Sequence, residues 1–560
     1  MNMQDLPFSP VGPVPNARQL EWWGRERTAF LHFGINTFTG NEWGDGTENP
    51  ALFNPTELDC RQWIFALKAA GFTAAILTAK HHDGFCLWPT KYTEHSVKNS
   101  PYKGGKGDIV REFTDACRLE GIKAGLYLSP WDRHEPTWGS DAYNDFYVGQ
   151  LEELMSGYGK IWNCWWDGAG STKTKYDWER WVNTLRRYQP DAVIFGSFGA
   201  TPWVDVRWIG NEIGYASIPC WSTIDPTALE QEIGTLLNKG DPCGTAYIPP
   251  EADVSIRPGW FYHEEQDTMV RSPKNLTDLW FHSIGRGTGW LLNLPPDRRG
   301  LLHEADVRAL RSFADTLSEN LSKNLAKGAT LTATSIRGDG YAPGDALAEG
   351  EGCYAPQDGC LTPVLTVTFD APTAINTVAF GEPPALGHRI RAYRVEALVD
   401  SEWKVLFTGE SVGAYCARRI DPVTAEAIRI SVTEAIAEPM LYKLGVYLFR
   451  EAEEAEGTVR WQNLAGWSST VTYGEEGLVL RLRGIYPFDL LRLPADGITR
   501  FAIDLFDGTD FHEYTTVTHT GKGECEYRFP ERITFAYQLR LRVLEPAGVT
   551  LTEANRPKLF

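Results

Sequence analysis

Two acidic residues of this chain could together hydrolyse a glycosidic bond. Asp167 directly follows the apolar and aromatic run 161–166, and Gly168 follows it. A carboxylate at the end of a buried strand costs free energy unless it is paired or used. Side chains alternate along a strand, so Trp165 and Asp167 point the same way, which suits a sugar ring stacked beside a nucleophile. From this segment alone, Asp167 could instead cap the helix that follows.

Glu212 is the candidate partner carboxylate. It lies in a predicted loop after the strand expected near 207–211. Arg207 precedes it on that strand and could hold a sugar hydroxyl or keep a carboxylate ionised. Glu251 and Asp253 are rivals to Glu212 as the acid, and a plain surface position is the alternative reading of Glu212 itself.

A carboxylate pair defines a reaction class but leaves its stereochemistry open. Carboxyl groups about 5 Å apart let one group attack the sugar with retention, whereas a separation of about 6.5–9.5 Å admits a water and gives inversion. The sequence does not fix that separation. By themselves, the residues therefore predict a glycoside hydrolase and nothing finer.

Two adjacent histidines follow another buried strand. His81 and His82 follow the run 72–79 after one residue, Lys80, and their imidazoles could hydrogen-bond to sugar hydroxyls. A zinc site is disfavoured because the nearby Cys and Asp residues lack the spacing expected of its ligands, so we expect no metal and no cofactor. Polar packing at the strand end is the simpler alternative.

The elements that must position these residues alternate between strand and helix from about residue 28 to about residue 320. The expected strands are 30–38, 72–79, 122–129, 161–166, 192–198, 207–211, 245–249 and 289–294. The expected helices run from Asn54-Pro55 to Gly71, from Asp108 to Gly121, and over 143–158, 176–188 and 303–320. Candidate polar residues stand where several of the apolar runs stop.

Repeated strand–helix units of this size imply a parallel sheet. About seven or eight of them favour an α/β fold of the (β/α)₈ type, which is a TIM-like barrel. The pattern is compatible with an irregular second half. In such a barrel the chemistry is expected at the carboxyl ends of the strands. An open doubly wound sheet is the alternative, but no Gly-rich phosphate loop follows the first strand.

Beyond about residue 325, alternating strands and turn residues replace the helical periods. We therefore expect three domains: the barrel at 1–325, a β-sandwich at 326–450 and a second β-sandwich at 451–560. The acidic stretch 451–457 marks the second boundary.

The amino-acid composition limits the classes of molecule that this chain is expected to bind. The formal net charge is −19 with no block of like charges, which disfavours nucleic acid and anionic membranes. The 21 Trp and 22 Tyr suit sugar binding, and Trp260 could line an apolar pocket, although most of these aromatics belong to the core. The N-terminus lacks signal-peptide features, so a cytoplasmic location is expected unless a leader was trimmed. Free thiols are expected, although Cys353 and Cys360 are close enough to pair.

At these motifs the chain resembles glycoside hydrolase family 29, the retaining α-L-fucosidases, over roughly residues 15–320. The resemblance rests on Leu31-His32-Phe33-Gly34, Glu42-Trp43-Gly44, Lys80-His81-His82-Asp83-Gly84-Phe85, Trp165-Trp166-Asp167-Gly168 and Trp290-Leu291-Leu292-Asn293-Leu294-Pro295-Pro296. It implies that Asp167 is the nucleophile. It also implies a fucose pocket formed by His32, Glu42, Trp43, His81, His82 and Trp165, with looser matches at Tyr127 and Arg207.

The stretch Arg207-Trp208-Ile209-Gly210-Asn211-Glu212 is similar to the subgroup that cleaves α-1,3 and α-1,4 links of Lewis-type glycans. In that subgroup the Glu of this motif is the acid/base, which implies Glu212 here. The domain at 326–450 resembles carbohydrate-binding modules of the discoidin type. A fucosylated oligosaccharide is the expected partner, and the oligomeric state stays open. A broad-specificity fucosidase, a glycosidase for another sugar, a metal hydrolase using His81 and His82, and a non-catalytic fucose-binding barrel are the alternatives.

Overall fold

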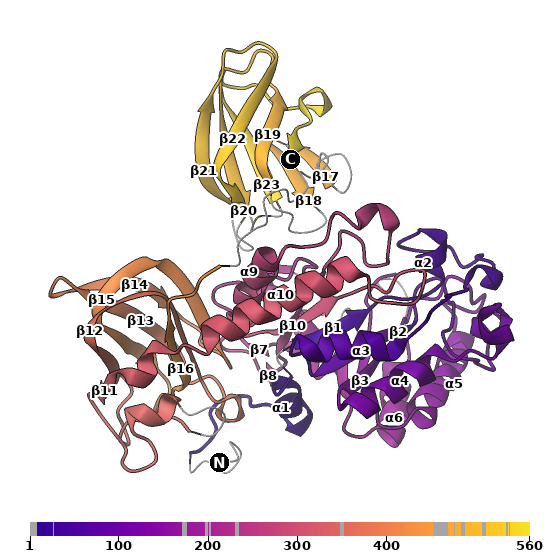
Figure 1. The fold of residues 1–560 in the computed structure, drawn as a ribbon, viewed down its shortest axis with the longest axis horizontal. Coiled ribbons are helices and arrows are strands. Elements are labelled where there is room, and N and C mark those ends of the chain that lie inside the picture. Colours follow the sequence, from indigo (N-terminus) through magenta and orange to yellow (C-terminus); the bar gives the residue numbers. More distant parts are fainter. Residues whose placement is uncertain are drawn as a thin grey trace.

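The chain contains a barrel and two all-β units (Figure 1). The structure is a computed structural model. It describes residues 8–25, 27–170, 176–196, 200, 203–229, 234–347, 352–451, 469–474, 477–482, 488–506, 511–533, 536 and 538–559.

The barrel consists of parallel strands that close in the order β1-β10-β9-β6-β5-β4-β3-β2. Its strands are β1 (Arg27–Leu31), β2 (Ala74–Lys80), β3 (Lys123–Leu128), β4 (Asn163–Trp166), β5 (Val193–Gly196), β6 (Val206–Trp208), β9 (Pro250–Ser255) and β10 (Gly289–Asn293). All seven residues of β2 and all six of β9 are buried, as expected where helices cover a parallel sheet. The predicted fold class, a TIM-like barrel followed by β-sandwich domains, is confirmed.

The first half of the barrel is regular. Its covering helices are α3 (Cys60–Ala69), α4 (Ile109–Glu120), α5 (Asp141–Gly157) and α6 (Trp178–Tyr188). Helix α4 begins as predicted: the Asp108 side chain accepts a hydrogen bond from the Arg111 amide at 2.9 Å. It ends at Gly121, whose φ of 74° is a left-handed conformation that glycine adopts without steric cost.

The predicted start of α3 at Asn54-Pro55 is wrong. The Asp59 side chain caps this helix by accepting from the amides of Arg61 and Gln62. The preceding segment is instead held to the loop after β10, because the amides of Glu57 and Asp59 donate to the carbonyls of Arg299 and Gly300. These backbone bonds between distant segments override a local helix-start signal.

Two predicted strands also differ from the structure. The strand expected over 30–38 ends at Leu31, and the short helix α2 (Ile35–Thr39) follows. The strand expected at 245–249 is not part of the barrel: β8 (Ala246–Tyr247) pairs with β7 (Thr223–Ile224) in a separate two-stranded sheet. The barrel strand is β9, which begins at Pro250 and therefore carries Glu251 and Asp253 inside the barrel wall.

The second half of the barrel is irregular. Between β6 and β9 the described helices are only the short α7 (Pro226–Leu229) and α8 (Gly234–Lys239). The longer helices α9 (Pro273–His282) and α10 (Glu304–Leu321) then cover the last strands. At the other end of the chain, α1 (Ala17–Trp23) places Trp22 in the aromatic core inside the barrel, together with Phe30, Tyr127 and Trp165.

The first all-β unit has its own core around Tyr354, Val378 and Val446. Its strands are β11 (Thr330–Ala333), β12 (Val364–Gly381), β13 (Ile390–Val399), β14 (Glu402–Gly409), β15 (Cys416–Ala435) and β16 (Tyr442–Tyr447). Cys353 and Cys360 are both free thiols.

The second all-β unit lies above α9 and α10 in Figure 1. Its strands are β17 (Ser469–Gly474), β18 (Gly477–Leu482), β19 (Phe488–Pro494), β20 (Arg500–Phe506), β21 (Phe511–Thr518), β22 (Glu524–Ile533), β23 (Gln538–Glu545) and β24 (Lys558–Leu559). Met269 of the barrel domain packs against the core of this unit, and Phe506 packs against the core of the barrel, so the two units are in contact.

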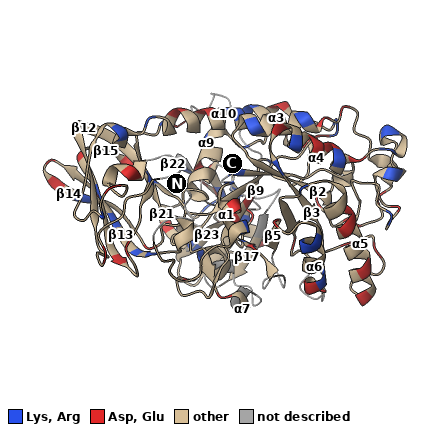
Figure 2. Cartoon of the chain, turned by 90° about the horizontal axis from the view of Figure 1, so that it is seen from below, with Lys and Arg blue, Asp and Glu red and all other residues tan. Residues whose placement is uncertain are grey.

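Basic and acidic residues are interspersed along the outer helices α4 and α10 (Figure 2). Within the described residues, no helix combines the length and apolar character needed to cross a bilayer.

Candidate active site

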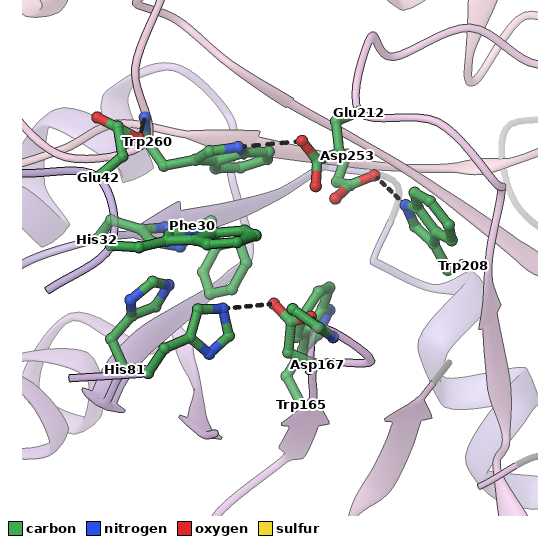
Figure 3. Close-up of a pocket in the computed structure, with 13 residues that line it drawn as sticks. Phe30, His32, Glu42, His81, Trp165, Asp167, Trp208, Glu212, Asp253 and Trp260 are labelled. Atoms are coloured by element: carbon green, nitrogen blue, oxygen red, sulfur yellow. Dashed lines mark hydrogen bonds and ion pairs between the residues drawn. The ribbon is translucent and has the colours of Figure 1, made fainter. Parts of the chain in front are cut away.

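A cavity of about 220 Å³ opens at the carboxyl ends of the barrel strands (Figure 3). It is lined by Phe30, His32, Glu42, Trp43, His81, His82, Trp165, Asp167, Ala169, Trp208, Glu212, Asp253 and Trp260. Every predicted site residue except Tyr127 and Arg207 is in this lining. Side chains that are far apart in the sequence thus meet around one small space, as the barrel fold requires.

Asp167 stands at the end of β4 and accepts hydrogen bonds on both carboxylate oxygens. The Tyr127 hydroxyl donates to Oδ2 at 3.2 Å, and the Ala169 amide donates to Oδ1 at 2.7 Å. The Nε2 atom of His82 lies 3.8 Å from Oδ2. These hydrogen bonds fix the orientation of the Asp167 carboxylate, which lines the cavity and could attack a bound sugar.

Three buried histidines line the side of the cavity next to Asp167. Burial lowers the pKa of His32 to about 3 and that of His82 to about 4, and it places the pKa of His81 well below its usual value. The three imidazoles are therefore neutral near pH 7. A neutral imidazole carries one donor and one acceptor, which matches a sugar hydroxyl.

The orientation of His32 is fixed by Asn293. The Asn293 amide nitrogen donates to Ser255 Oγ and to the Trp260 carbonyl, so its Oδ1 is an acceptor for His32 Nδ1 at 2.9 Å. This hydrogen bond puts the proton on Nδ1 and leaves Nε2 as an acceptor. His32 can therefore accept a hydrogen bond from a sugar hydroxyl.

Glu212 enters the cavity from the loop after β6. The Trp260 indole Nε1 donates to Glu212 Oε2 at 3.3 Å (Figure 3). Burial among the surrounding protein atoms, and then the negative charge of Asp167, raise the pKa of Glu212 to about 7. The Glu212 side chain is exposed to water in the cavity, and this water weakens both effects. Glu212 can therefore hold a proton near neutral pH.

The two rival acids occupy different levels of β9. Glu251 is buried below the cavity, where it accepts from the indoles of Trp22 at 3.2 Å and Trp165 at 3.1 Å. It does not line the cavity, which argues against it as the acid. Asp253 stands two residues further along the strand, lines the cavity and accepts from the Trp208 indole at 3.0 Å.

Glu42 contacts Trp260 and His263 at the rim of the cavity. Its Oε2 accepts from the Trp260 amide at 2.7 Å, and its Oε1 lies 2.6 Å from His263 Nε2. These contacts hold the loop that carries Trp260 over the cavity. Trp43 follows Glu42, is 56% exposed and packs edge-on against His82, so its indole is available to a ligand.

Two predicted site residues lie outside the lining. Arg207 is 1% exposed, and its guanidinium donates to the carbonyls of Leu237, Trp221 and Ile248. Since side chains alternate along β6, Arg207 faces the segments outside the barrel while its neighbours face inward, which argues against the expected sugar contact. Tyr127 lies beneath Asp167 and acts on it through the hydroxyl.

Phe30, Trp208 and Ala169 line the cavity but were not predicted. Phe30 has a signal in the sequence, because it stands on β1 two residues before His32, the first residue after the strand, and side chains two positions apart in extended chain point the same way. Trp208 likewise ends β6, two residues after Val206 of the interior core. Within the described residues, no group of three or more His, Cys, Asp or Glu side chains is arranged to hold a metal ion.

Comparisons with known proteins point to one family. The model of the family Alpha-L-fucosidase matches residues 14–321. Alpha-L-fucosidase 1 of Arabidopsis thaliana is 39% identical over 80% of this chain and 90% of the plant protein. A structure from Bacteroides thetaiotaomicron, described as an α-L-fucosidase, is 46% identical, covers 79% of this chain and 98% of its own, and has a TM-score of 0.77. A family 29 fucosidase of Ruminococcus gnavus in complex with fucose is 32% identical over 82% of this chain and 99% of its own, with a TM-score of 0.73.

Proposed function

Because the chain belongs to the α-L-fucosidases of glycoside hydrolase family 29, we propose that it releases α-L-fucose from the α-1,3 and α-1,4 links of Lewis-type glycans by a double displacement. Asp167 is the nucleophile and Glu212 is the acid/base. The observation that carries this proposal is that Glu212, whose pKa is raised to about 7, and Asp167, whose carboxylate is held by two hydrogen bonds, line the same cavity.

The first displacement forms a covalent intermediate. An Asp167 carboxylate oxygen attacks C1 of fucose, and the bond from C1 to the glycosidic oxygen breaks. Glu212 gives its proton to that oxygen, so the glycan leaves as an alcohol. The hydrogen bonds from Tyr127 and Ala169 support this role, because they hold the Asp167 carboxylate in place before the attack.

The second displacement returns the enzyme to its starting state. Glu212, now a carboxylate, removes a proton from a water molecule, and the water oxygen attacks C1. The ester bond to Asp167 breaks, fucose leaves with its configuration retained, and Glu212 is protonated again. None of these steps needs a cofactor.

The remaining lining residues would hold the sugar. His32, His81 and His82 match the ring hydroxyls as neutral donors and acceptors. Fucose carries a methyl group where related hexoses carry CH₂OH, and an apolar wall that includes Trp260 would favour it by about 1–3 kcal/mol. Glu42 and Trp43 would complete the grip from the rim of the cavity.

The linkage preference rests on the stretch Arg207-Trp208-Ile209-Gly210-Asn211-Glu212, which resembles the subgroup acting on Lewis-type structures. Its test compares fucose release from a Lewis-type trisaccharide, from 2′-fucosyllactose and from an aryl fucoside. We expect the trisaccharide to be cleaved with the highest kcat/KM. Equal rates on all three would support a broad-specificity fucosidase, and fucose binding without turnover would support a non-catalytic barrel.

Stereochemistry is tested by proton NMR during hydrolysis of an accepted fucoside. A retaining mechanism gives α-L-fucose as the first anomer, followed by mutarotation. If β-L-fucose forms first, the double displacement is wrong even though the substrate is right.

A further inference from the structure

Of the four carboxyl groups that line the cavity, Asp253 is the one to which the proposed function gives no role. Asp253 lies on β9, is 3% exposed and lines the cavity next to Glu212. In Figure 3 the Asp253 and Glu212 side chains lie next to each other on the side of the cavity across from His81. A buried carboxyl group without a role is costly, so its placement beside the acid needs an explanation.

Two indoles and one backbone bond fix the geometry of this pair. Trp208 donates to Asp253 at 3.0 Å, and Trp260 donates to Glu212 at 3.3 Å. The Gly214 amide, two residues after Glu212, donates to the Asp253 carbonyl at 3.1 Å. The loop that carries the acid is therefore attached to the strand at the residue that carries the second carboxyl group.

The charges around the pair are mostly negative. Glu212 is influenced by Asp167 from β4, by Glu42 from the rim and by Arg481 from β18, whose positive charge opposes the other two. Asp253 is influenced by Glu212 and by Glu251 of its own strand, and the Trp208 hydrogen bond acts in the opposite direction. Two adjacent carboxyl groups in such a site do not both ionise readily, and they titrate as a unit.

We propose that Glu212 and Asp253 share one proton in the resting enzyme, with Asp253 acting as a positioning residue that keeps this proton available to Glu212. This inference rests on the proposed function, in which Glu212 is the acid. Trp208 donates to Asp253 and Trp260 donates to Glu212, so either carboxyl group can be the ionised member while the other holds the proton. Burial and the charge of Glu212 raise the pKa of Asp253 well above its usual range, which agrees with a strongly coupled pair.

Proton balance through the reaction is simple. The pair starts with one proton, loses it to the glycosidic oxygen in the first displacement, and regains it from the attacking water in the second. Asp253 forms no bond to the sugar. Its effect is to hold the proton on the pair at a pH where an isolated carboxyl group would have lost it.

The test is the pH profile of kcat/KM for Asp253→Asn on an unactivated fucoside. Asparagine can still accept from the Trp208 indole but carries no charge. We expect the alkaline limb to move to lower pH by about one unit. On a dinitrophenyl fucoside, whose leaving group needs no proton, the variant should show no such shift. A general structural defect would alter both substrates alike.

Glu251→Gln is the matched control, because it removes an equally buried carboxyl group from the same strand but outside the cavity. We expect its alkaline limb to move much less. Trp208→Phe removes the hydrogen bond to Asp253 and should move the limb in the opposite direction, to higher pH. This variant tests the proposal even if Asp253→Asn does not fold.

An unshifted or raised limb in Asp253→Asn, or equal shifts in Asp253→Asn and Glu251→Gln, would overturn proton sharing. The proposed function fails on a different observation: a wild-type enzyme that does not release fucose, or a Glu212→Ala variant with unchanged activity on the unactivated fucoside. The two failures are therefore distinguishable.

Discussion

The two halves of the barrel support the reaction in different ways. In the first half, regular strand–helix units place His32, His81, His82 and Asp167 at or just beyond strand ends. In the second half, β6 has three residues, and Glu212 and Trp260 come from loops. Of the second-half polar residues that line the cavity, Asp253 is carried by a strand.

This difference indicates which half of the barrel can change its substrate contacts more easily. The regular half holds the proposed nucleophile and the neutral imidazoles, which would meet the part of the substrate that every fucoside shares. The irregular half holds the proposed acid, which would meet the leaving group, and Trp260, which would contact the fucose methyl group. Loops tolerate change better than barrel strands, so substrate choice is easier to alter in the second half.

The largest effect is expected in the regular half. Asp167→Asn removes the nucleophile and should lower kcat by about 10⁴-fold or more on any fucoside. Thermal unfolding serves as the control, since the variant keeps the shape of the side chain and should melt near the wild-type temperature. Near-normal turnover by a folded variant would refute the mechanism.

In the irregular half, Glu212→Ala should lower kcat/KM by about 10²–10⁴-fold on a substrate with a poor leaving group. Azide, which can occupy the vacated space and attack C1 of the intermediate, should restore turnover of an activated aryl fucoside if that substrate is accepted. Rescue at Glu251→Ala instead would reassign the acid to the lower level of β9.

The pH dependence of kcat/KM tests whether Glu212 must be protonated for activity. The pKa of Glu212 is raised to about 7, so the acid is protonated below this pH and ionised above it. We expect kcat/KM for an unactivated fucoside to be maximal below pH 7 and then to fall about tenfold for each further pH unit. A flat profile up to pH 9 would contradict Glu212 as the acid.

Tyr127→Phe tests the regular half of the barrel, where Tyr127 contacts Asp167. It removes one hydrogen bond to the Asp167 carboxylate and leaves the ring in the core, so kcat should fall about three- to tenfold. The reduction should be similar for activated and unactivated fucosides, because the nucleophile is needed for both. A loss confined to the unactivated substrate would link Tyr127 to the acid.

The smallest effect is expected from the second all-β unit. The charge of Arg481 lowers the pKa of Glu212 across the contact between this unit and the barrel. Arg481→Ala should therefore move the alkaline limb to higher pH by a few tenths of a unit, and the shift should shrink in high salt. A limb that does not move would show that this unit does not influence the acid.

The part of the site that the sequence could predict also differs between the two halves of the barrel. A long apolar run that stops at a polar residue marks a strand end, and this signal predicted the positions of Asp167, His81 and His82. The signal fails for β9, because Glu251 and Asp253 break the apolar pattern of a strand that is nevertheless fully buried. Arg207 was misplaced because β6 is too short for its alternation to be recognised without its neighbours.

One small helix matters more than its position in the chain suggests. The Glu251 carboxylate joins Trp22 of α1 to Trp165, and Trp165 stands two residues before the nucleophile. An affinity tag or a shortened start near residue 17 would therefore disturb the floor of the catalytic chamber, although it lies far from Asp167 in the sequence.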